Sequence, residues 1–551
     1  MGPVIGTSYM DAFDDTLLQA PSTNPDPSGL LRIPKRPKPS LEWNDMPTEL
    51  RLMFLEKIAQ ITRVHPPPQK GSLPAVCTEW RDFFEKRNFE SLTVKDLDDI
   101  VNLNLIVNSR REGFVKRIAL FVALGAYDCR RCDQAESDGE KEWNNVTFGR
   151  TLLLLLEILS TWGLLNKEQS YEGLTLMIGA ASVSDVQHNY TKLEGLKCDP
   201  AVREAQHLRH YQSHQFSQEG FKKRTLGSLL DFDTGFGEMI FEGPTNDKDR
   251  VKIPQVRTVR RLLLDRRYFR SLSAQALELV LRRLPCLTEI KYVYWCGIDR
   301  EEQSLRDLAN LALLKAFPST VTGILLQEIY DIELHEHSRK VNDETVAAAA
   351  VEATRRLSYF HGSNALDAAH FFKDFYPGLP HQLVSPEPWT TLRYLALTSR
   401  STMRHDVSPL LANQLLVAAA NAALHMPKLK IMELWISWKV HGTFVFHYAV
   451  LDNATVLETG AAWPFDLQQE ARDAWERVAF ANTRHRLRER IIDSADLTAW
   501  NNLSKTIRML RTLYCTAIAR YDVSVHPTGH LANKQTGNVS NVLEKPKAIM
   551  D

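Results

Sequence analysis

One apolar spacing recurs along most of this chain and constrains its fold more than any other feature of the sequence. In each copy an apolar residue is followed by two more, three and five positions later, as in Val115, Ile118 and Leu120. Six further sets share this spacing: Tyr171/Leu174/Leu176, Val259/Leu262/Leu264, Leu287/Ile290/Tyr292, Val321/Ile324/Leu326, Leu392/Leu395/Leu397 and Leu429/Met432/Leu434. Because alternate residues of a strand share one face, each set predicts a short strand with inward side chains, preceded by one more inward residue.

Amphipathic segments come before several of these predicted strands. They predict helices over 151–165, 274–284, 304–316, about 344–372 and 410–425. Three apolar-Pro pairs, at Leu284-Pro285, Phe317-Pro318 and Met426-Pro427, separate a predicted helix from the strand that follows. A helix–strand unit of this size cannot bury its apolar face alone, so neighbouring units are expected to stack on one another.

The intervals between successive sets test whether the units form a regular repeat. Intervals of 28, 34 and 37 residues lie near or above the about 20–29 residues of a leucine-rich repeat. The 71-residue interval after Val321 could hold two units with one strand unrecognised, and the 88-residue interval after Tyr171 contains an insertion over 192–252. The Asn or Cys of a standard leucine-rich repeat is absent from all seven sets. The expected fold class is therefore α/β, an irregular leucine-rich-repeat-like helix–strand solenoid, with a plain α/β fold as the alternative.

A short helix near the amino end carries two apolar stripes instead of one. Asn44 or Asp45 can cap its start, and Pro47 suits its first turn. One stripe contains Leu50, Phe54, Ile58 and Ile61, and the opposite one contains Leu52, Leu55 and Ala59. A surface helix of a self-contained domain normally has one apolar stripe. Two stripes need two partners, of which one can be the domain's own core and the other a second protein or domain.

A second helix is predicted over 75–87, opened by Pro74, with Val76, Trp80 and Phe83 on one face. The simplest interpretation of both helices is a small hairpin that packs on its own protein. The pair also resembles an F-box, the short helical module that docks onto the Skp-type adaptor of cullin–RING ubiquitin ligases. The residues that match the F-box are Met46-Pro47, Glu49-Leu50, Phe54, Ile58, Val76, Trp80 and Phe83.

What the resemblance implies is a set of adaptor-binding or supporting residues. They are Met46, Pro47, Leu50, Phe54, Ile58, Val76 and Trp80. The sequence departs from the F-box pattern between the two helices, where residues 64–74 read VHPPPQKGSLP. The family usually has another short helical turn there, whereas three consecutive prolines favour an extended polyproline conformation.

Composition excludes several classes of protein. The chain has 67 basic and 67 acidic residues, so its charge gives no case for nucleic acid or an anionic membrane as partner. Seven scattered cysteines and the lack of a cationic-then-apolar start favour an intracellular setting, cytoplasmic or nuclear. The longest apolar run, 151–165, contains Glu157 and is too short to span a membrane.

No motif of a known catalytic site is present, so the chain is not expected to be an enzyme, and no cofactor or metal is expected. Weak candidates have plainer explanations. Cys129 and Cys132 lack a second ligand pair and are expected to be free thiols. His207, His210 and His214 could share a helix face but suit a solvated polar insertion, and Gly235 and Gly237 suit a flexible loop.

The predicted layout is a disordered leader (1–40), an F-box-like helical module (41–90), the solenoid (91–440), a hairpin with a helical cap (441–523) and a disordered tail (524–551). In the cap, a hairpin around Asp452-Asn453 precedes helices over 467–492 and 497–519. The whole layout resembles fungal F-box proteins with a divergent leucine-rich-repeat-like region. This implies a substrate receptor that binds an adaptor, through it a cullin, and an unidentified target protein. The alternative is a protein-binding scaffold without a ligase link.

Overall fold

The structure is a computed structural model. It describes residues 43–64, 73–128, 130–132, 134–162, 173–187, 222–231, 253–329, 343–378, 387–438, 442–492 and 497. The predicted leader, the Pro-rich segment from 65 to 72, most of the insertion, nearly all of the helix at 497–519 and the tail lie outside these residues.

The chain divides into two compact units, Met1–Ser72 and Leu73–Asp551. In the first unit the structure describes a 3-10 turn, η1 (Trp43–Asp45), and one helix, α1 (Thr48–Val64). The remaining described elements belong to the second unit, which begins with η2 (Leu73–Ala75) and α2 (Thr78–Phe89).

A mixed, mostly parallel sheet of twelve strands forms the centre of the second unit, and its strands follow one another in chain order. They are β1 (Ser91–Val94), β2 (Arg117–Leu124), β3 (Leu174–Ser182), β5 (Val259–Phe269), β7 (Glu289–Trp295), β8 (Gly323–Ile329), β9 (Tyr359–Asp367), β10 (Tyr394–Thr398), β11 (Ile431–Trp438), β12 (Gly442–Val450), β13 (Thr455–Ala461) and β14 (Leu487–Ile491). Only the pairs β11–β12 and β12–β13 are antiparallel among these strands. The fold class is therefore α/β.

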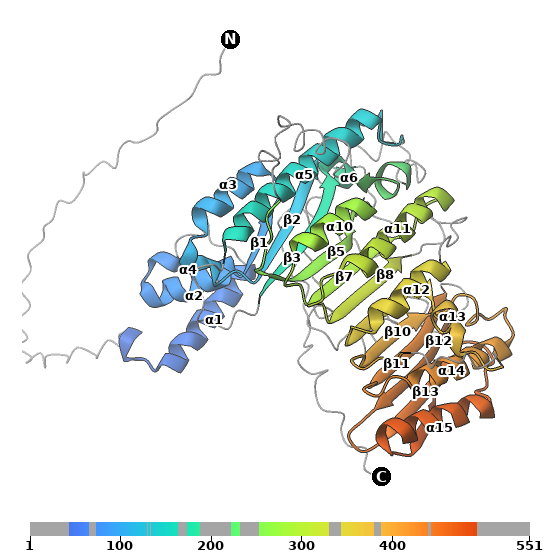
Figure 1. Ribbon diagram of the computed structural model, residues 1–551. Coiled ribbons are helices and arrows are strands. Elements are labelled where there is room, and N and C mark those ends of the chain that lie inside the picture. Colours follow the sequence, from blue (N-terminus) through green and yellow to red (C-terminus); the bar gives the residue numbers. More distant parts are fainter. Residues whose placement is uncertain are drawn as a thin grey trace, which may run out of the picture. The chain divides into compact units, whose positions relative to one another are not determined.

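Helices connect the parallel strands and lie along one face of the sheet (Figure 1). The longer ones are α3 (Leu97–Ile106), α5 (Asp138–Thr161), α10 (Ala274–Arg283), α11 (Arg300–Ala316), α12 (Asp343–Thr354), α14 (Pro409–Ala423) and α15 (Gln469–Thr483). Shorter elements are α4 (Ser109–Glu112), α6 (Val183–Gln187), η3 (Lys222–Leu226), α13 (Ala368–Phe371), η4 (Lys373–Phe375) and the two-stranded pair β4 (Leu229–Leu230) and β6 (Ser271–Leu272).

The sequence pattern predicted the strands well. The last two residues of all seven apolar sets lie in strands, β2, β3, β5, β7, β8, β10 and β11, and all of them are buried. The predicted hairpin is also present as β12 and β13, which pair antiparallel around the turn at Asp452 and Asn453.

Three predicted helices were wrong in their bounds. The helix predicted over 344–372 ends at Thr354, and β9 occupies the following residues. The helix predicted from 151 begins at Asp138, because Ser137 and Glu140 form a reciprocal capping box there. The helix predicted over 467–492 ends at Thr483, because Arg484 takes a left-handed conformation, with φ 63°, and β14 follows.

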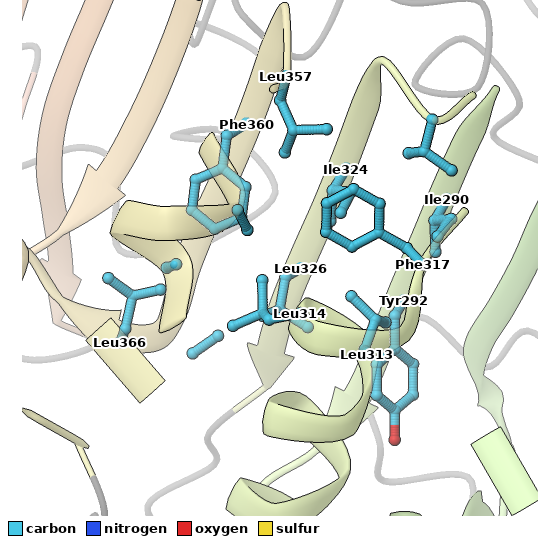
Figure 2. Packing of buried hydrophobic residues seen from close by; sticks show 14 of the residues in the cluster. Ile290, Tyr292, Leu313, Leu314, Phe317, Ile324, Leu326, Leu357, Phe360 and Leu366 are labelled. Carbon is cyan, nitrogen blue, oxygen red and sulfur yellow. The ribbon is translucent and has the colours of Figure 1, made fainter. Parts of the chain in front are cut away.

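The sheet carries buried apolar side chains on both faces. The larger cluster lies between the sheet and the helices, where Leu313 and Leu314 of α11 and Phe317, directly after it, pack near β7 and β8 (Figure 2). A second cluster lies on the opposite face of the sheet and includes Met177, Leu263, Leu325 and Trp435. Because both clusters are buried, neither face of the sheet presents these apolar side chains at the surface.

Candidate docking face near the amino end

The start of α1 is held by its own side chains. The Met46 N–H donates to the carbonyl of Trp43, and the Arg51 guanidinium reaches back to donate to the carbonyl of Met46 at 2.8 Å. Glu49 lies in the first turn, where a carboxylate complements the helix dipole. These contacts fix the chain entering the helix and therefore the direction of the side chains in its first two turns.

The two apolar stripes of α1 have different environments. Leu50 and Phe54 are 51 % and 50 % exposed, while Leu55 on the opposite stripe is fully buried. Ala59 is also buried, one turn beyond Leu55. Each stripe has one member that differs from the others, since Leu52 is exposed and does not share the burial of Leu55, and Ile58 is partly buried.

Two residues of the exposed face were not included in the predicted set. Met53 is exposed and lies three residues after Leu50, a spacing that places both on one side of the helix. The ring of Trp43 packs edge-on against that of Phe54, with centroids 5.6 Å apart. Helical spacing alone could have identified Met53, but the Trp43 contact depends on the turn before the helix. We define Leu50, Met53, Phe54 and Ile61 as the α1 face; Ile61 is also exposed.

The other predicted residues have mixed exposure. Pro47 is exposed, and Met46 and Ile58 are partly buried, all in the first unit. Val76 is exposed and Trp80 is partly buried, and both belong to the second unit. On α2 the ring of Trp80 packs against Phe84, the buried aromatic of that helix, with centroids 5.7 Å apart. The structure therefore groups the α1 residues in one unit and places Val76 and Trp80 in the other.

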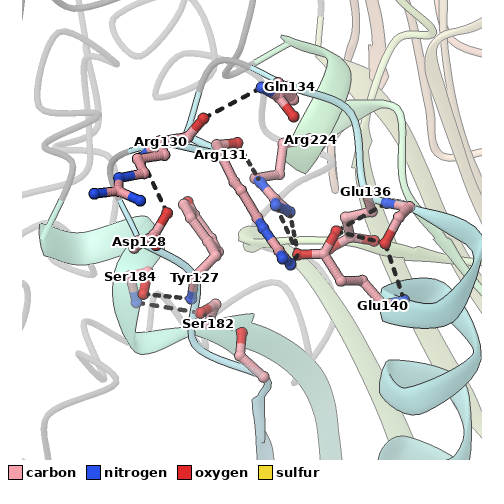
Figure 3. Close-up of polar contacts among 12 residues, drawn as sticks. Tyr127, Asp128, Arg130, Arg131, Gln134, Glu136, Glu140, Ser182, Ser184 and Arg224 are labelled. Carbon is pink, nitrogen blue, oxygen red and sulfur yellow. Dashed lines mark hydrogen bonds and ion pairs between the residues drawn. The ribbon is translucent and has the colours of Figure 1, made fainter.

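A cluster of buried charged residues lies at the carboxyl ends of β2 and β3 (Figure 3). The Arg224 guanidinium donates to Glu140 at 2.8 Å and lies over the ring of Tyr127. Burial would raise the pKa of Glu140, but hydrogen bonds from Ser137 and the charge of Arg224 outweigh it and lower that pKa. Because these charges are already matched, the cluster is suited to holding loops together.

The space beside this cluster is small. An adjacent cavity of about 20 Å³, lined by Arg270, Ser271 and Tyr292 among others, has room for little more than a water molecule. Among the described residues, no group of three His, Cys, Asp or Glu side chains could hold a metal ion. Cys132 is described, whereas Cys129, the three histidines at 207, 210 and 214 and the glycines at 235 and 237 lie outside the described residues.

The profile of a family of unknown function (DUF6546) matches residues 306–516. The match begins in α11 and includes β8 to β14, and it leaves α1 and the first part of the sheet outside. Among curated proteins, none matches the chain. No helix of the described part of the chain is both long and apolar enough to cross a membrane.

Proposed function

We propose that this chain is the substrate-receptor subunit of a Skp–cullin–F-box ubiquitin ligase. One observation carries the proposal: Leu50 and Phe54 are half exposed on a helix that buries Leu55 and Ala59 on its opposite side. Such a receptor breaks no bond itself. It holds a target protein near the ubiquitin-loaded enzyme and so raises the effective concentration of the reacting groups.

The α1 face has the chemistry that a protein interface requires. Its four large apolar side chains share this side of the helix with one exposed charged residue, Lys57, which lies between Phe54 and Ile61. Covering a large apolar side chain contributes roughly 1.5–3 kcal/mol when burial is complete. Half of this gain at four positions is roughly 3–6 kcal/mol, which is comparable to the lower end of the about 4–15 kcal/mol cost of association. A stable complex therefore also needs adaptor contacts beyond the α1 face. The resemblance to an F-box identifies a Skp-type adaptor as the partner, with a cullin behind it.

For the second unit we propose a divergent helix–strand solenoid that holds the target. The support is the order of the strands, which follow the chain without exchange, together with the helices on one side of the sheet. Met177, Leu263 and Leu325, which face away from the helices, are buried and so are not offered to a partner. We therefore place the target at an edge of this array.

A binding assay with the full-length chain tests the adaptor proposal. Immobilised wild-type chain should retain a purified Skp-type adaptor, and Leu50→Ala combined with Phe54→Ala should lower the retained amount by roughly 30-fold, because two central contacts are removed. The matched control is Val101→Ala with Leu105→Ala, which truncates two exposed apolar residues of α3.

Equal retention by the wild type and the Leu50/Phe54 variant would reject the assignment of the α1 face. Absence of retention by the wild type would favour the alternative function, a protein-binding scaffold without a ligase link. Loss of binding in the α3 control as well would show that any exposed apolar residue contributes, and this too would count against a specific face.

A further inference from the structure

Strand β14 is the last strand of the twelve-stranded sheet in the described part of the chain, and four of its five side chains are exposed. It pairs in parallel with β13, and no other described strand pairs with it. Arg488, Glu489, Arg490 and Ile491 are all exposed, and Ile491 is 74 % exposed. An edge strand of this kind leaves one row of backbone N–H and C=O groups available to another chain.

The direction of these backbone groups follows from one hydrogen bond. The Ile492 N–H donates to the carbonyl of Thr459, in β13, at 2.8 Å. Backbone groups of successive strand residues point to opposite sides, so the N–H of Ile491 points away from β13. This N–H belongs to the row that an added strand would meet.

The same edge has an excess of positive charge. Arg484, Arg486 and Arg488 are exposed and pair with no carboxylate among the described residues. Nearby charges are already matched: Arg472 pairs with Glu489 at 2.8 Å, and Arg490 lies 3.5 Å from Glu458. The three remaining guanidinium groups within five residues favour a negatively charged partner.

An exposed aromatic residue adds an apolar contact beside these charges. Phe480 of α15 is 61 % exposed, and the guanidinium of Arg484 lies 5.5 Å from the centre of its ring. Cation–π contact of this kind keeps the guanidinium in place while leaving its edge available for a carboxylate. The surface therefore combines a backbone edge, cations and an apolar side chain.

We propose that β14 binds an acidic, extended segment of a partner protein, which adds to the sheet as a further strand. Backbone pairing supplies the alignment, and acidic side chains meet Arg484, Arg486 and Arg488. The claim that β14 holds the target of the ligase rests on the proposed function. The claim that β14 binds an acidic peptide does not. The opposing explanation is that the charges only prevent edge-to-edge aggregation.

Fluorescence anisotropy with labelled twelve-residue peptides and the full-length chain tests this proposal. A peptide of alternating Glu and Val should bind, more weakly at 300 mM than at 50 mM salt, because the charged contacts are exposed. A Lys/Val peptide and a Glu-rich peptide interrupted by prolines should not bind. Binding of a single-stranded oligonucleotide in place of the Glu/Val peptide would overturn the proposal, as would no binding at all.

Two sets of variants separate the charges from the backbone. The double variant Arg486→Ser with Arg488→Ser should lower the affinity for the Glu/Val peptide roughly tenfold. Ile491→Pro removes the outward N–H at a position where an edge strand tolerates proline. It should weaken binding more than its control, Ile491→Ala, which keeps that N–H. Equal binding by Ile491→Pro and Ile491→Ala, or by the arginine variant and wild type, would overturn the inference. Adaptor retention by the same variants should be unchanged, so failure here is distinct from failure of the proposed function.

Discussion

Arg270 is enclosed by the protein and bound by two carboxylates. Its guanidinium pairs with Asp185 and, at 2.7 Å, with Glu136, and all three side chains are buried. Tyr127 donates its hydroxyl to Asp185 at 2.7 Å, which ties the loop after β2 to the same group. A buried ion pair adds little stability compared with apolar residues in place of all its members. Removing one member alone is costly, because it leaves an unpaired charge in the interior.

Arg270→Met should therefore lower the free energy of unfolding by about 3–5 kcal/mol, because Asp185 and Glu136 lose their partner while remaining buried. Urea unfolding followed by circular dichroism measures this change. Arg282→Met is the control, since Arg282 pairs with Glu278 on the exposed side of α10, and its effect should stay below about 1 kcal/mol. Similar losses in both variants would mean that the buried cluster has no special role.

His361 of β9 should make stability depend on pH. Burial lowers its pKa to about 3, and the nearby charge of Lys291 acts in the same direction. The unfolded chain binds this proton near pH 6.5, so folding is favoured less as the pH falls from about 6.5 to 3, by about 1.4 kcal/mol per pH unit. Above pH 6.5 both states are neutral and the effect vanishes.

The measurement is the free energy of unfolding between pH 7.5 and 5 for wild type and His361→Asn. The variant should be less stable at pH 7.5 but show a shallower decline toward pH 5. An unchanged slope in His361→Asn would refute the assignment of this pH dependence to His361.

At the scale of elements, a single glycine in β9 interrupts the apolar spacing that identified the other strands. Leu357, Phe360 and Gly362 have the spacing of the other sets, but glycine takes the third apolar place. A Cβ atom on Gly362 would lie 2.8 Å from the ring of Phe360 and 3.1 Å from Leu366 and from Leu397. The inward space at this position is already filled by neighbouring side chains, so an apolar residue is excluded there.

Gly362→Ala should accordingly destabilise the chain by about 1–3 kcal/mol through overpacking. Gly139→Ala, in the first turn of α5, is the matched control, because its added Cβ would meet no atom within 4 Å. That variant should be neutral or slightly stabilising, by up to about 1 kcal/mol. Thermal unfolding of both variants measures their change in stability. A Gly362→Ala variant as stable as the wild type would show that the side chains around β9 can rearrange to accept the added methyl group.

Periodicity was sufficient for strands with three apolar inward positions and for the hairpin of β12 and β13, and insufficient for β1, β9 and β14. It located β7 and β8, although both strands continue three residues beyond the last apolar position of their sets. It missed β14, because LRERI carries charges at three consecutive positions and so shows no apolar alternation. Conformation at a single residue, such as the left-handed Arg484 that ends α15, also cannot be seen in an apolar pattern.

The candidate site was predictable to the extent that it depends on helical spacing. Two stripes on α1 follow from the positions of Leu50, Phe54 and Leu55, and the structure exposes the first two and buries the third. The contact of Trp43 with Phe54 and the packing of Trp80 on Phe84 depend on turns and on side-chain directions that spacing does not determine.

In the whole molecule, the proposed receptor uses one surface in each unit. The adaptor would cover the α1 face in the first unit, and an acidic strand would add to β14 in the second. Holding a target and the ligase on one chain raises their effective concentration without any catalytic group.

Isothermal titration of the purified full-length chain with a Skp-type adaptor tests the central claim most directly. The account predicts a saturable one-to-one complex with a Kd of about 1 μM or tighter, weakened roughly 30-fold by Leu50→Ala with Phe54→Ala. No binding at tens of micromolar adaptor, or equal affinity of wild type and the double variant, would contradict it.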